Sequence, residues 1–296
     1  MHKGWLVVNG YITNPKFLEI YQWLLDAGKR QGCEIIRKTN IELMELFCKE
    51  PEEKTRILKE QEKPEFVIFW DKDVRLAKLM EESGIRLFNS AEGIAVCDDK
   101  SMTYIRLKQA GIRMPKTWIA PKTFAADGYD HLEFFENAAA ELGYPLIVKE
   151  CFGSFGRQVY LAKDWEELVS ILQELKNRPF ILQEYIESSC GRDIRIQIVG
   201  GEMTACMYRY NDADFRANIT NGGKMKPYQP EQAQKAMAQE VCRCLNLDFA
   251  GVDILFGEND EPVLCEVNSN AHFKNIYDCT GVNVADAIIS HVLRSI

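Results

Sequence analysis

The stretch that decides the fold runs from residue 249 to residue 270 and reads FAGVDILFGENDEPVLCEVNSN. It consists of two apolar runs on either side of a polar centre. The dipeptide formed by Asn259 and Asp260 in that centre favours a tight turn. We therefore expect a β-hairpin with these two residues at its tip.

This turn fixes which residues of the two strands lie opposite each other. On one face it pairs Phe256 with Val263, Ile254 with Cys265 and Val252 with Val267. On the other face it pairs Leu255 with Leu264 and Asp253 with Glu266, and Asn268 follows two residues beyond Glu266. The hairpin is thus predicted to have one wholly apolar face and one that carries charge.

Asp253 and Glu266 are an unusual pair. The Cβ atoms of directly opposed residues lie about 5 Å apart, and two like charges repel at that distance. A divalent cation between them would remove the repulsion. Two carboxylates and the amide oxygen of Asn268 suit Mg²⁺ or Mn²⁺ shared with phosphates better than zinc. The alternative interpretation is that both carboxylates simply face water.

The composition is that of an ordinary globular protein. With 296 residues the chain is long enough for two domains or three small ones. A formal charge of −8 argues against a nucleic-acid-binding surface that covers the molecule. The first apolar run is too short for a signal peptide or a membrane span. We therefore expect a cytoplasmic protein with no nucleic-acid or membrane partner.

Residues 1–115 alternate short apolar runs with amphipathic stretches. The runs at 5–8, 34–36, 66–70 and 86–89 predict strands, and the stretches at 16–30, 42–47, 74–82 and 91–98 predict helices. This order is typical of a small parallel sheet covered by helices. A further helix opens at Asp99, and Lys100 lies in its first turn, where the helix dipole disfavours a cation. Lys100 is either one surface lysine among many or a ligand for a phosphate.

A loop containing Gly153, Ser154 and Gly156 joins two predicted strands, at 145–150 and 159–162. A Rossmann fingerprint opens a helix and a P-loop ends in Gly-Lys-Ser/Thr, so neither motif fits. The order found in protein kinases is not met either, because Lys149 comes before the loop. The loop is either an ordinary turn or a flexible flap whose backbone N–H groups close over an anion.

The remaining chain is predicted to add strands and a loop rich in hydrogen-bond donors. Residues 180–187 form a strand whose exposed backbone could bind an adenine edge. Residues 191–199 alternate with period two and place Asp193 and Arg195 on one face. The loop at 212–224 carries guanidinium, amide and ammonium groups, which favour an anionic ligand. Helices are expected at 132–143, 164–176, 231–245 and 282–294.

Taken together, these segments resemble the ATP-grasp superfamily, specifically the RimK-like carboxylate-amine ligases of the alpha-L-glutamate type. The matching residues are Lys100, Val148-Lys149, Gly153-Ser-x-Gly156, Gln183-Glu-Tyr-Ile186, Asp193-Ile-Arg195, Asp214-Phe-Arg216-x-Asn218, Gly222-Gly223, Ala250-Gly-Val-Asp-Ile-Leu255 and Glu266-Val-Asn268. Each piece is weak alone, but their order and spacing across residues 98–290 are specific. Residues 1–97 fit the pre-ATP-grasp domain only loosely.

The resemblance implies the ATP-grasp fold, of mixed α/β and α+β class. Residues 1–115 would form an α/β pre-ATP-grasp domain. Residues 116–188 would form the central α+β subdomain with the glycine-rich flap, and residues 189–296 the C-terminal α+β subdomain with the metal and catalytic site. ATP would lie between the two subdomains.

The resemblance also implies roles for single residues. ATP would be contacted by Lys100, Lys149, Gly153, Ser154, Gly156, Gln183, Glu184, Tyr185, Ile186, Asp193, Arg216 and Asn218, with residues 183–186 at the adenine and Asp193 at the ribose. The catalytic residues would be Arg209, Arg216 and Asn218. Asp253, Glu266 and Asn268 would bind Mg²⁺ or Mn²⁺, typically as two ions, in agreement with the pairing derived from the hairpin.

The implied reaction is the formation of an amide bond driven by ATP. A carboxylate would first become an acyl phosphate, and an amine would then displace phosphate while the flap excludes water. We expect glutamate or another amino acid to be joined to a small molecule, peptide or protein, and we allow for a homo-oligomer. The alternatives are an ATP-grasp kinase and a non-catalytic nucleotide-binding regulatory protein.

Two places depart from the family pattern. Gln158 stands where RimK-like members usually have another glycine, and residues 269–275 replace a Ser-Pro-Gly turn. The second segment adjoins the acceptor site, so the identity of the amine is the least transferable part of the resemblance. The candidates for substrate contact are Arg195, Lys224, Asn270 and His272. His272 is either a base for the amine or a structural residue.

Overall fold

The computed structural model describes residues 1–60, 63–153 and 156–296. Its N-terminal sheet has four parallel strands in the order β2-β1-β3-β4, namely β1 (Lys3–Val8), β2 (Glu34–Thr39), β3 (Phe66–Trp70) and β4 (Leu87–Phe88). The helices of this part are α1 (Pro15–Arg30), α2 (Asn40–Phe47), α3 (Pro51–Glu60) and α4 (Val74–Glu82). The predicted parallel sheet is confirmed. Helix α3 was not predicted, because it is almost wholly polar and buries only Leu58.

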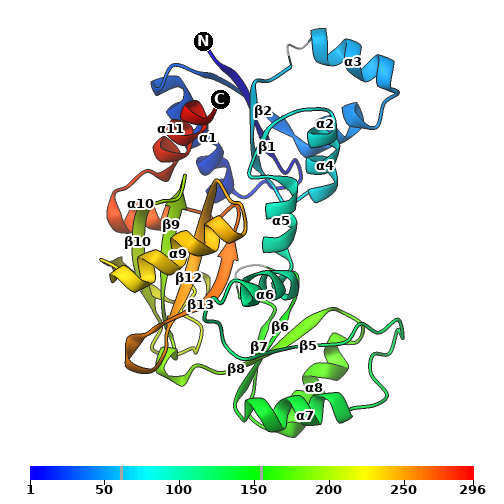
Figure 1. Cartoon of the computed structure of the whole chain (residues 1–296), viewed down its shortest axis with the longest axis vertical. Helices are drawn as coiled ribbons and strands as arrows, with labels where there is room; N and C mark the ends of the chain where they lie inside the picture. Colours follow the sequence, from blue (N-terminus) through cyan, green and yellow to red (C-terminus); the bar gives the residue numbers. More distant parts are fainter. Residues whose placement is uncertain (61–62, 154–155) are drawn as a thin grey trace.

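A second, antiparallel sheet lies at the opposite end of the molecule (Figure 1). Its order is β5-β8-β6-β7, with β5 (Thr117–Ile119), β6 (Leu146–Glu150), β7 (Val159–Ala162) and β8 (Phe180–Glu184). Helices α7 (Glu133–Leu142) and α8 (Trp165–Leu175) cover it, and their side chains join those of the sheet in one apolar cluster. Strand β5 was not anticipated. It is three residues long and half-buried throughout, so it lacks a clear alternation.

The third sheet carries the hairpin and has the order β11-β10-β9-β12-β13. Its strands are β9 (Arg192–Val199), β10 (Glu202–Tyr210), β11 (Lys224–Pro227), β12 (Phe249–Phe256) and β13 (Pro262–Asn268). One face packs on α9 (Gln232–Cys244) through Ile194, Ile196 and Ile198, as the period-two pattern predicts. Helices α5 (Ala91–Asp98) and α6 (Lys100–Gln109) link the N-terminal sheet to this region, and Ser90 caps α5.

The hairpin differs in part from its predicted register. Asp253 pairs with Glu266 and Val252 with Val267, as predicted. Beyond Asp253 the register shifts by one residue. Ile254 pairs with Leu264, Leu255 with Val263 and Phe256 with Pro262. The predicted partners of these three residues, Cys265, Leu264 and Val263, were therefore wrong. The turn is longer than two residues, with the Gly257 N–H donating to the Glu261 carbonyl over 2.8 Å. A bulge at Cys265 absorbs the difference and leaves the acidic pair in place.

The last two helices bring the chain back to the N-terminal sheet. Helix α10 (Lys274–Thr280) was not predicted, whereas α11 (Val284–Ser295) was. Helix α11 lies beside α1, and a 2.6 Å ion pair joins Arg30 to Asp286. Residues 1–115 therefore share their core with the end of the chain, and the division at residue 115 stays a prediction.

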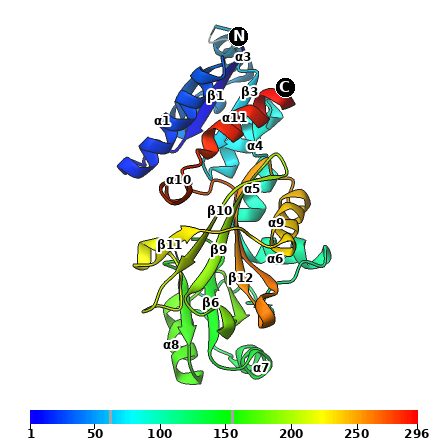
Figure 2. The ribbon, with the colours of Figure 1, turned by 90° about the vertical axis from the view of Figure 1, so that its left-hand side faces the viewer.

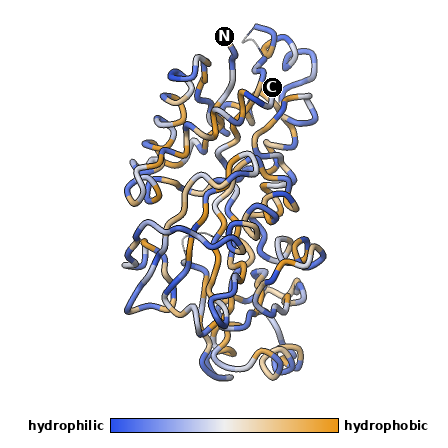
Figure 3. The backbone as a smooth tube through the Cα atoms, turned by 60° about the vertical axis from the view of Figure 1, so that its left-hand side comes forward, coloured by the Kyte–Doolittle hydropathy of each residue, from blue (hydrophilic) through white to orange (hydrophobic). Residues whose placement is uncertain are grey.

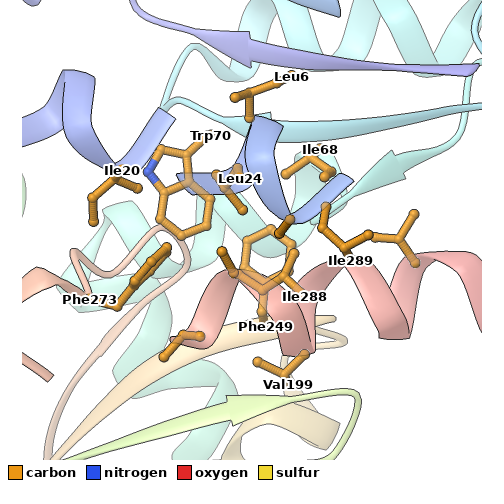
Figure 4. Close-up of a cluster of buried hydrophobic side chains, with 14 of the residues drawn as sticks. Leu6, Ile20, Leu24, Ile68, Trp70, Val199, Phe249, Phe273, Ile288 and Ile289 are labelled. Atoms are coloured by element: carbon orange, nitrogen blue, oxygen red, sulfur yellow. The ribbon is translucent and has the colours of Figure 1, made fainter. Parts of the chain in front are cut away.

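One apolar cluster joins the N-terminal sheet to the third sheet (Figure 4). The indole of Trp70 stacks on Phe249 with ring centroids 5.4 Å apart and meets Phe273 edge-on at 5.6 Å. Figure 2 shows the three sheets following one another along the long axis of the molecule. The tube in Figure 3 is mostly apolar along the central strands, whereas the outer helices carry both apolar and polar stretches.

Candidate active site

A pocket lies between the second and third sheets and encloses about 910 Å³ of empty space, including the part open to solvent. The predicted residues that line it are Lys100, Lys149, Gly153, Gly156, Gln183, Glu184, Tyr185, Ile186, Asp193, Arg209, Arg216, Asn218, Asp253 and Glu266. Ser154 lies outside the described residues. The fold thus gathers residues from five separate segments around one space.

Five predicted residues do not line this pocket: Arg195, Lys224, Asn268, Asn270 and His272. Arg195 and Asn268 lie next to it on the same sheet face. Lys224 is exposed and lies 3.3 Å from Asp212. His272 Nε2 lies 2.9 Å from the Lys16 carbonyl, so it faces the start of α1.

One end of the pocket is lined by residues that follow the strand pairing of β8. The pairing ends at Glu184, whose N–H donates to the Lys116 carbonyl over 2.9 Å. Tyr185 and Ile186 then continue as irregular backbone along the pocket wall. Gln183 is buried and its Nε2 donates to Thr117 Oγ1 over 2.8 Å, while its Oε1 has no partner among the described residues. That oxygen is free to accept a hydrogen bond from a ligand.

Charges of both signs cross the pocket-facing side of the third sheet. Strand pairing sets Asp193 beside Arg209, Arg195 beside Asp253, and Asp253 beside Glu266. Arg209 donates two hydrogen bonds to Asp193, of 2.6 and 2.7 Å, and its Nη2 lies 3.0 Å from Asp253. Arg195 donates two more to Asp253, both of 2.6 Å. Every buried charge in this row therefore has a partner of opposite sign.

Burial and pairing oppose each other in setting the pKa values of this row. Burial disfavours the charged form of Asp253, but Arg195 and Arg209 outweigh it and lower the pKa of that carboxyl. At Asp193, burial outweighs Arg209 and raises the pKa. Burial also disfavours the charge of Arg209, yet the two aspartates raise its pKa above the ordinary value. Asp253 is thus held as the carboxylate at neutral pH.

Two lysines reach the pocket from the opposite side. Lys100 Nζ, at the start of α6, lies 3.6 Å from Glu266 Oε1. Lys149, on β6, places its Nζ 3.8 Å from Cys265 Sγ. These two ammonium groups face the acidic pair of the hairpin across the pocket. The pocket thus contains both the ammonium groups and the carboxylates that a metal-bound polyphosphate requires.

Arg216 links the glycine loop to the third sheet. Its guanidinium is held by Asp214 through bonds of 3.0 and 2.8 Å, and Nη1 donates to the Gly156 carbonyl over 2.9 Å. Asp214 raises the pKa of Arg216 by hydrogen bonding to it. Gly156 has φ +69°, and a Cβ there would lie 2.9 Å from Asn218 Oδ1. The loop therefore approaches Arg216 and Asn218 closely.

The sequence pattern of the RimK-like ATP-grasp domain matches residues 97–292, and these residues contain every side chain of the pocket just described. The chain belongs to the RimK-like ATP-grasp family. This confirms the family, the ATP-grasp fold and the ligase class that the resemblance implied, at the level of the family. RimK-like ATP-grasp proteins are carboxylate-amine ligases that bind ATP.

The chain is similar to several known proteins. An uncharacterized protein of Mycoplasma pneumoniae is 29% identical over 95% of this chain and 98% of its own length. Beta-citrylglutamate synthase B of Danio rerio is 31% identical, and N-acetylaspartylglutamate synthase A of Homo sapiens is 30% identical, each over 75% of this chain. The chain spans about half the length of these two synthases, 54% and 56%.

Two solved structures share the fold of this RimK-like chain. The RimK domain protein from Sphaerobacter thermophilus has a TM-score of 0.72 over 98% of both chains, at 18% identity. The ATP complex of D-alanine–D-alanine ligase from Bacillus anthracis has a TM-score of 0.74 over 100% of this chain and 98% of its own, also at 18% identity. In the described residues of this family member, helices long and apolar enough to cross a membrane are absent.

The hairpin of this RimK-like site fits a magnesium ion in its donor set. Asn268 Nδ2 is buried and has no partner among the described residues. Rotating this amide by 180° exchanges its nitrogen and oxygen, so the same position can present an oxygen to a cation. The described part of the chain contains no group of three His, Cys, Asp or Glu side chains placed so that they could hold a metal ion by themselves. A metal would therefore need Asn268 and phosphate oxygens beside Asp253 and Glu266.

Several residues that line the RimK-like pocket were not predicted. Ile147, Val159, Phe215, Leu255 and Cys265 supply its apolar walls. Ile147 lies two residues before Lys149 and Leu255 two residues after Asp253, so the period of a strand would have placed both on the pocket side. Cys265 was predicted on the apolar face, and the bulge turns it into the pocket instead. Nothing local in the sequence signals that bulge.

Proposed function

We propose that this protein joins a carboxylic acid to an amine in an ATP- and Mg²⁺-dependent reaction that passes through an acyl phosphate. The observation that carries the proposal is the meeting of Lys100, Lys149 and Arg216 with the acidic pair of the hairpin in one pocket. A carboxylate and the γ-phosphate are both anions, so their approach requires cations on either side.

The first step makes the acyl phosphate. A substrate carboxylate oxygen forms a bond to the γ-phosphorus while the bond from that phosphorus to the bridging oxygen breaks, and ADP leaves. Lys100, Lys149 and Arg216 neutralise the phosphate oxygens. Asp253, Glu266 and Asn268 would hold Mg²⁺, which withdraws charge from the phosphates when bound. Arg195 and Arg209 hold Asp253 in place and ionised.

The second step makes the amide. The amine nitrogen attacks the carbonyl carbon, phosphate leaves with the electrons of the C–O bond, and the nitrogen gives up a proton. His272 is a candidate for accepting that proton. Since a carbonyl can only accept, Nε2 carries the hydrogen donated to Lys16, and Nδ1 has the free lone pair. Burial lowers the pKa of His272, which keeps the ring neutral at pH 7.

We propose glutamate as the amine, because the names of two relatives, beta-citrylglutamate synthase and N-acetylaspartylglutamate synthase, contain it. His272 and Arg195 lie close enough for the charge of Arg195 to lower the pKa of the histidine, and they are our candidates for a base and a carboxylate partner. The nucleotide and the metal are shared by the family. The acid is the part of the substrate pair that this chain must select by itself.

The test is the dependence of ADP release on both substrates. Purified protein with ATP and Mg²⁺ is given each of a panel of carboxylic acids, with glutamate or with other amines. Ligation requires both the acid and the amine, and the product mass equals their sum less one water. ADP release with a single acceptor would indicate a kinase, and nucleotide binding without release in any combination would indicate a regulatory protein.

A further inference from the structure

Asn89 lies directly after β4 at the end of the N-terminal sheet, and its side chain is fully buried. Its Nδ2 donates to the Phe249 carbonyl over 2.9 Å and to the Ser269 carbonyl over 2.8 Å. Its Oδ1 accepts from the N–H groups of Asp248, over 2.7 Å, and of Phe249, over 3.1 Å. All four partners are backbone groups at the start of β12 or directly beside β12 and β13, although Asn89 belongs to the N-terminal part of the chain.

These four bonds close the open end of the hairpin. The pairing of β12 with β13 ends at Gly251 and Asn268. Beyond that pair, the Asn89 amide spans from Phe249 to Ser269 and satisfies buried backbone groups as a further peptide group would. Without the amide, four backbone groups, three of them buried, would lose a partner. Asn89 thus fixes the backbone immediately beyond Asn268.

The same segment of chain meets the hairpin a second time. From Asn89 the chain runs through α5 to Lys100, whose Nζ lies 3.6 Å from Glu266 Oε1. Asn89 therefore binds the backbone just beyond Asn268, at one end of this face of the hairpin, and Lys100 forms an ion pair with Glu266 on the same face. Ala271 also packs closely against Gly251, because a Cβ at position 251 would lie 2.4 Å from the Cβ of Ala271.

We propose that Asn89 is a positioning residue for the metal-binding face of the hairpin, so that an amide of the N-terminal sheet sets the place of Asn268 relative to Asp253 and Glu266. This inference rests on the proposed function, which assigns the metal to these three residues. It adds that the N-terminal part of the chain controls metal affinity without touching the metal. Residues that orient metal ligands typically change metal affinity about 10- to 100-fold when they are replaced.

The experiment compares Asn89→Ala and Asn89→Asp with Ser90→Ala in the full-length chain. Asn89→Ala removes the whole amide. Asn89→Asp keeps an acceptor for the N–H groups of Asp248 and Phe249 but removes the donor to the carbonyls of Phe249 and Ser269. Ser90→Ala is the matched control, because it removes the cap that accepts from the Gly93 N–H over 3.1 Å at the adjacent position and leaves the hairpin bonds intact.

The readout is binding and does not require turnover. Free Mn²⁺ is measured by electron paramagnetic resonance during titration of each protein with a non-hydrolysable ATP analogue present, and nucleotide binding is measured separately in EDTA. We expect both Asn89 variants to bind Mn²⁺ about 10- to 100-fold more weakly than wild type, with nucleotide affinity in EDTA unchanged. Ser90→Ala should match wild type in both.

Folded Asn89 variants that bind Mn²⁺ within about twofold of wild type would overturn the role of Asn89 and leave the proposed function intact. A wild type that binds no Mn²⁺ would overturn the metal assignment and this proposal together. If neither variant folds, hydrogen exchange of the wild type decides. Mn²⁺ added to the nucleotide complex should protect residues 86–92 together with 264–270, and protection of 264–270 alone would overturn the proposal.

Discussion

At the scale of single residues, the acidic pair of the hairpin has cations on both sides. Asp253 is held by Arg195 and Arg209, whereas Glu266 is partly exposed and, among the described residues, forms an ion pair only with Lys100, at 3.6 Å. The period of a strand was enough to predict that Asp253 opposes Glu266. The arginines that hold Asp253 come from β9 and β10, more than 40 residues earlier in the chain, and no local pattern signals such a contact.

Glu266→Ala should therefore abolish turnover while the fold stays intact. The substitution removes one of the three proposed metal ligands at a half-exposed position, so we expect kcat to fall by about 10²-fold or more with little change in the free energy of unfolding. ADP release and urea unfolding measure the two effects. Glu258→Ala, at the exposed hairpin turn, is the control, and normal activity of Glu266→Ala would refute the metal assignment.

His272 should make stability depend on pH. Its pKa is lowered by burial, with Arg195 and Lys16 also disfavouring the charge and Glu19 favouring it. The unfolded chain, with an ordinary histidine pKa of about 6.5, then binds the proton more readily, so protonation favours unfolding. Wild type should lose stability as pH falls through this value. His272→Gln keeps a donor for Lys16 and should lose less between pH 7.5 and 5.5 in urea unfolding. Equal losses would contradict the buried neutral ring.

At the scale of elements, the hairpin and helix α3 show where sequence patterns stop being informative. Both strands of the hairpin and its acidic pair were predictable, because alternation depends on neighbouring residues. The five-residue span from Gly257 to Glu261 and the bulge at Cys265 were not, because a longer turn and a bulge compensate each other and leave the same pairing near Asp253. Helix α3 was not predicted either, because it buries only Leu58 and its sequence therefore shows no apolar face.

The close approach of the glycine loop to Asn218 predicts a specific effect of Gly156→Ala. Both Gly156 and Gly281 have positive φ, +69° and +73°, so alanine costs about 1–2 kcal/mol in backbone strain at either place. Only at position 156 would the new Cβ also meet a side chain, Asn218 Oδ1 at 2.9 Å. We expect kcat/KM for ATP to fall about 10²-fold in Gly156→Ala and to stay near wild type in Gly281→Ala. Equal losses in steady-state ADP release would show that backbone strain alone is responsible.

At the scale of the whole molecule, the N-terminal sheet and the third sheet share one core, in which α11 packs against α1. Ile288 on α11 is 1% exposed and lies in the same cluster as Leu24 on α1 and Trp70 on β3. Ile288→Ala should therefore lower the free energy of unfolding of the full chain by about 2–5 kcal/mol, because it leaves a cavity in a core that two parts of the chain build together. Ile105→Ala is the control, since that side chain is 42% exposed and its truncation should change stability by no more than about 0.5 kcal/mol.

Calorimetry should also show both sheets unfolding in one transition in wild type. A separate early transition for residues 1–115, unaffected by Ile288→Ala, would mean that the N-terminal sheet folds independently of α11.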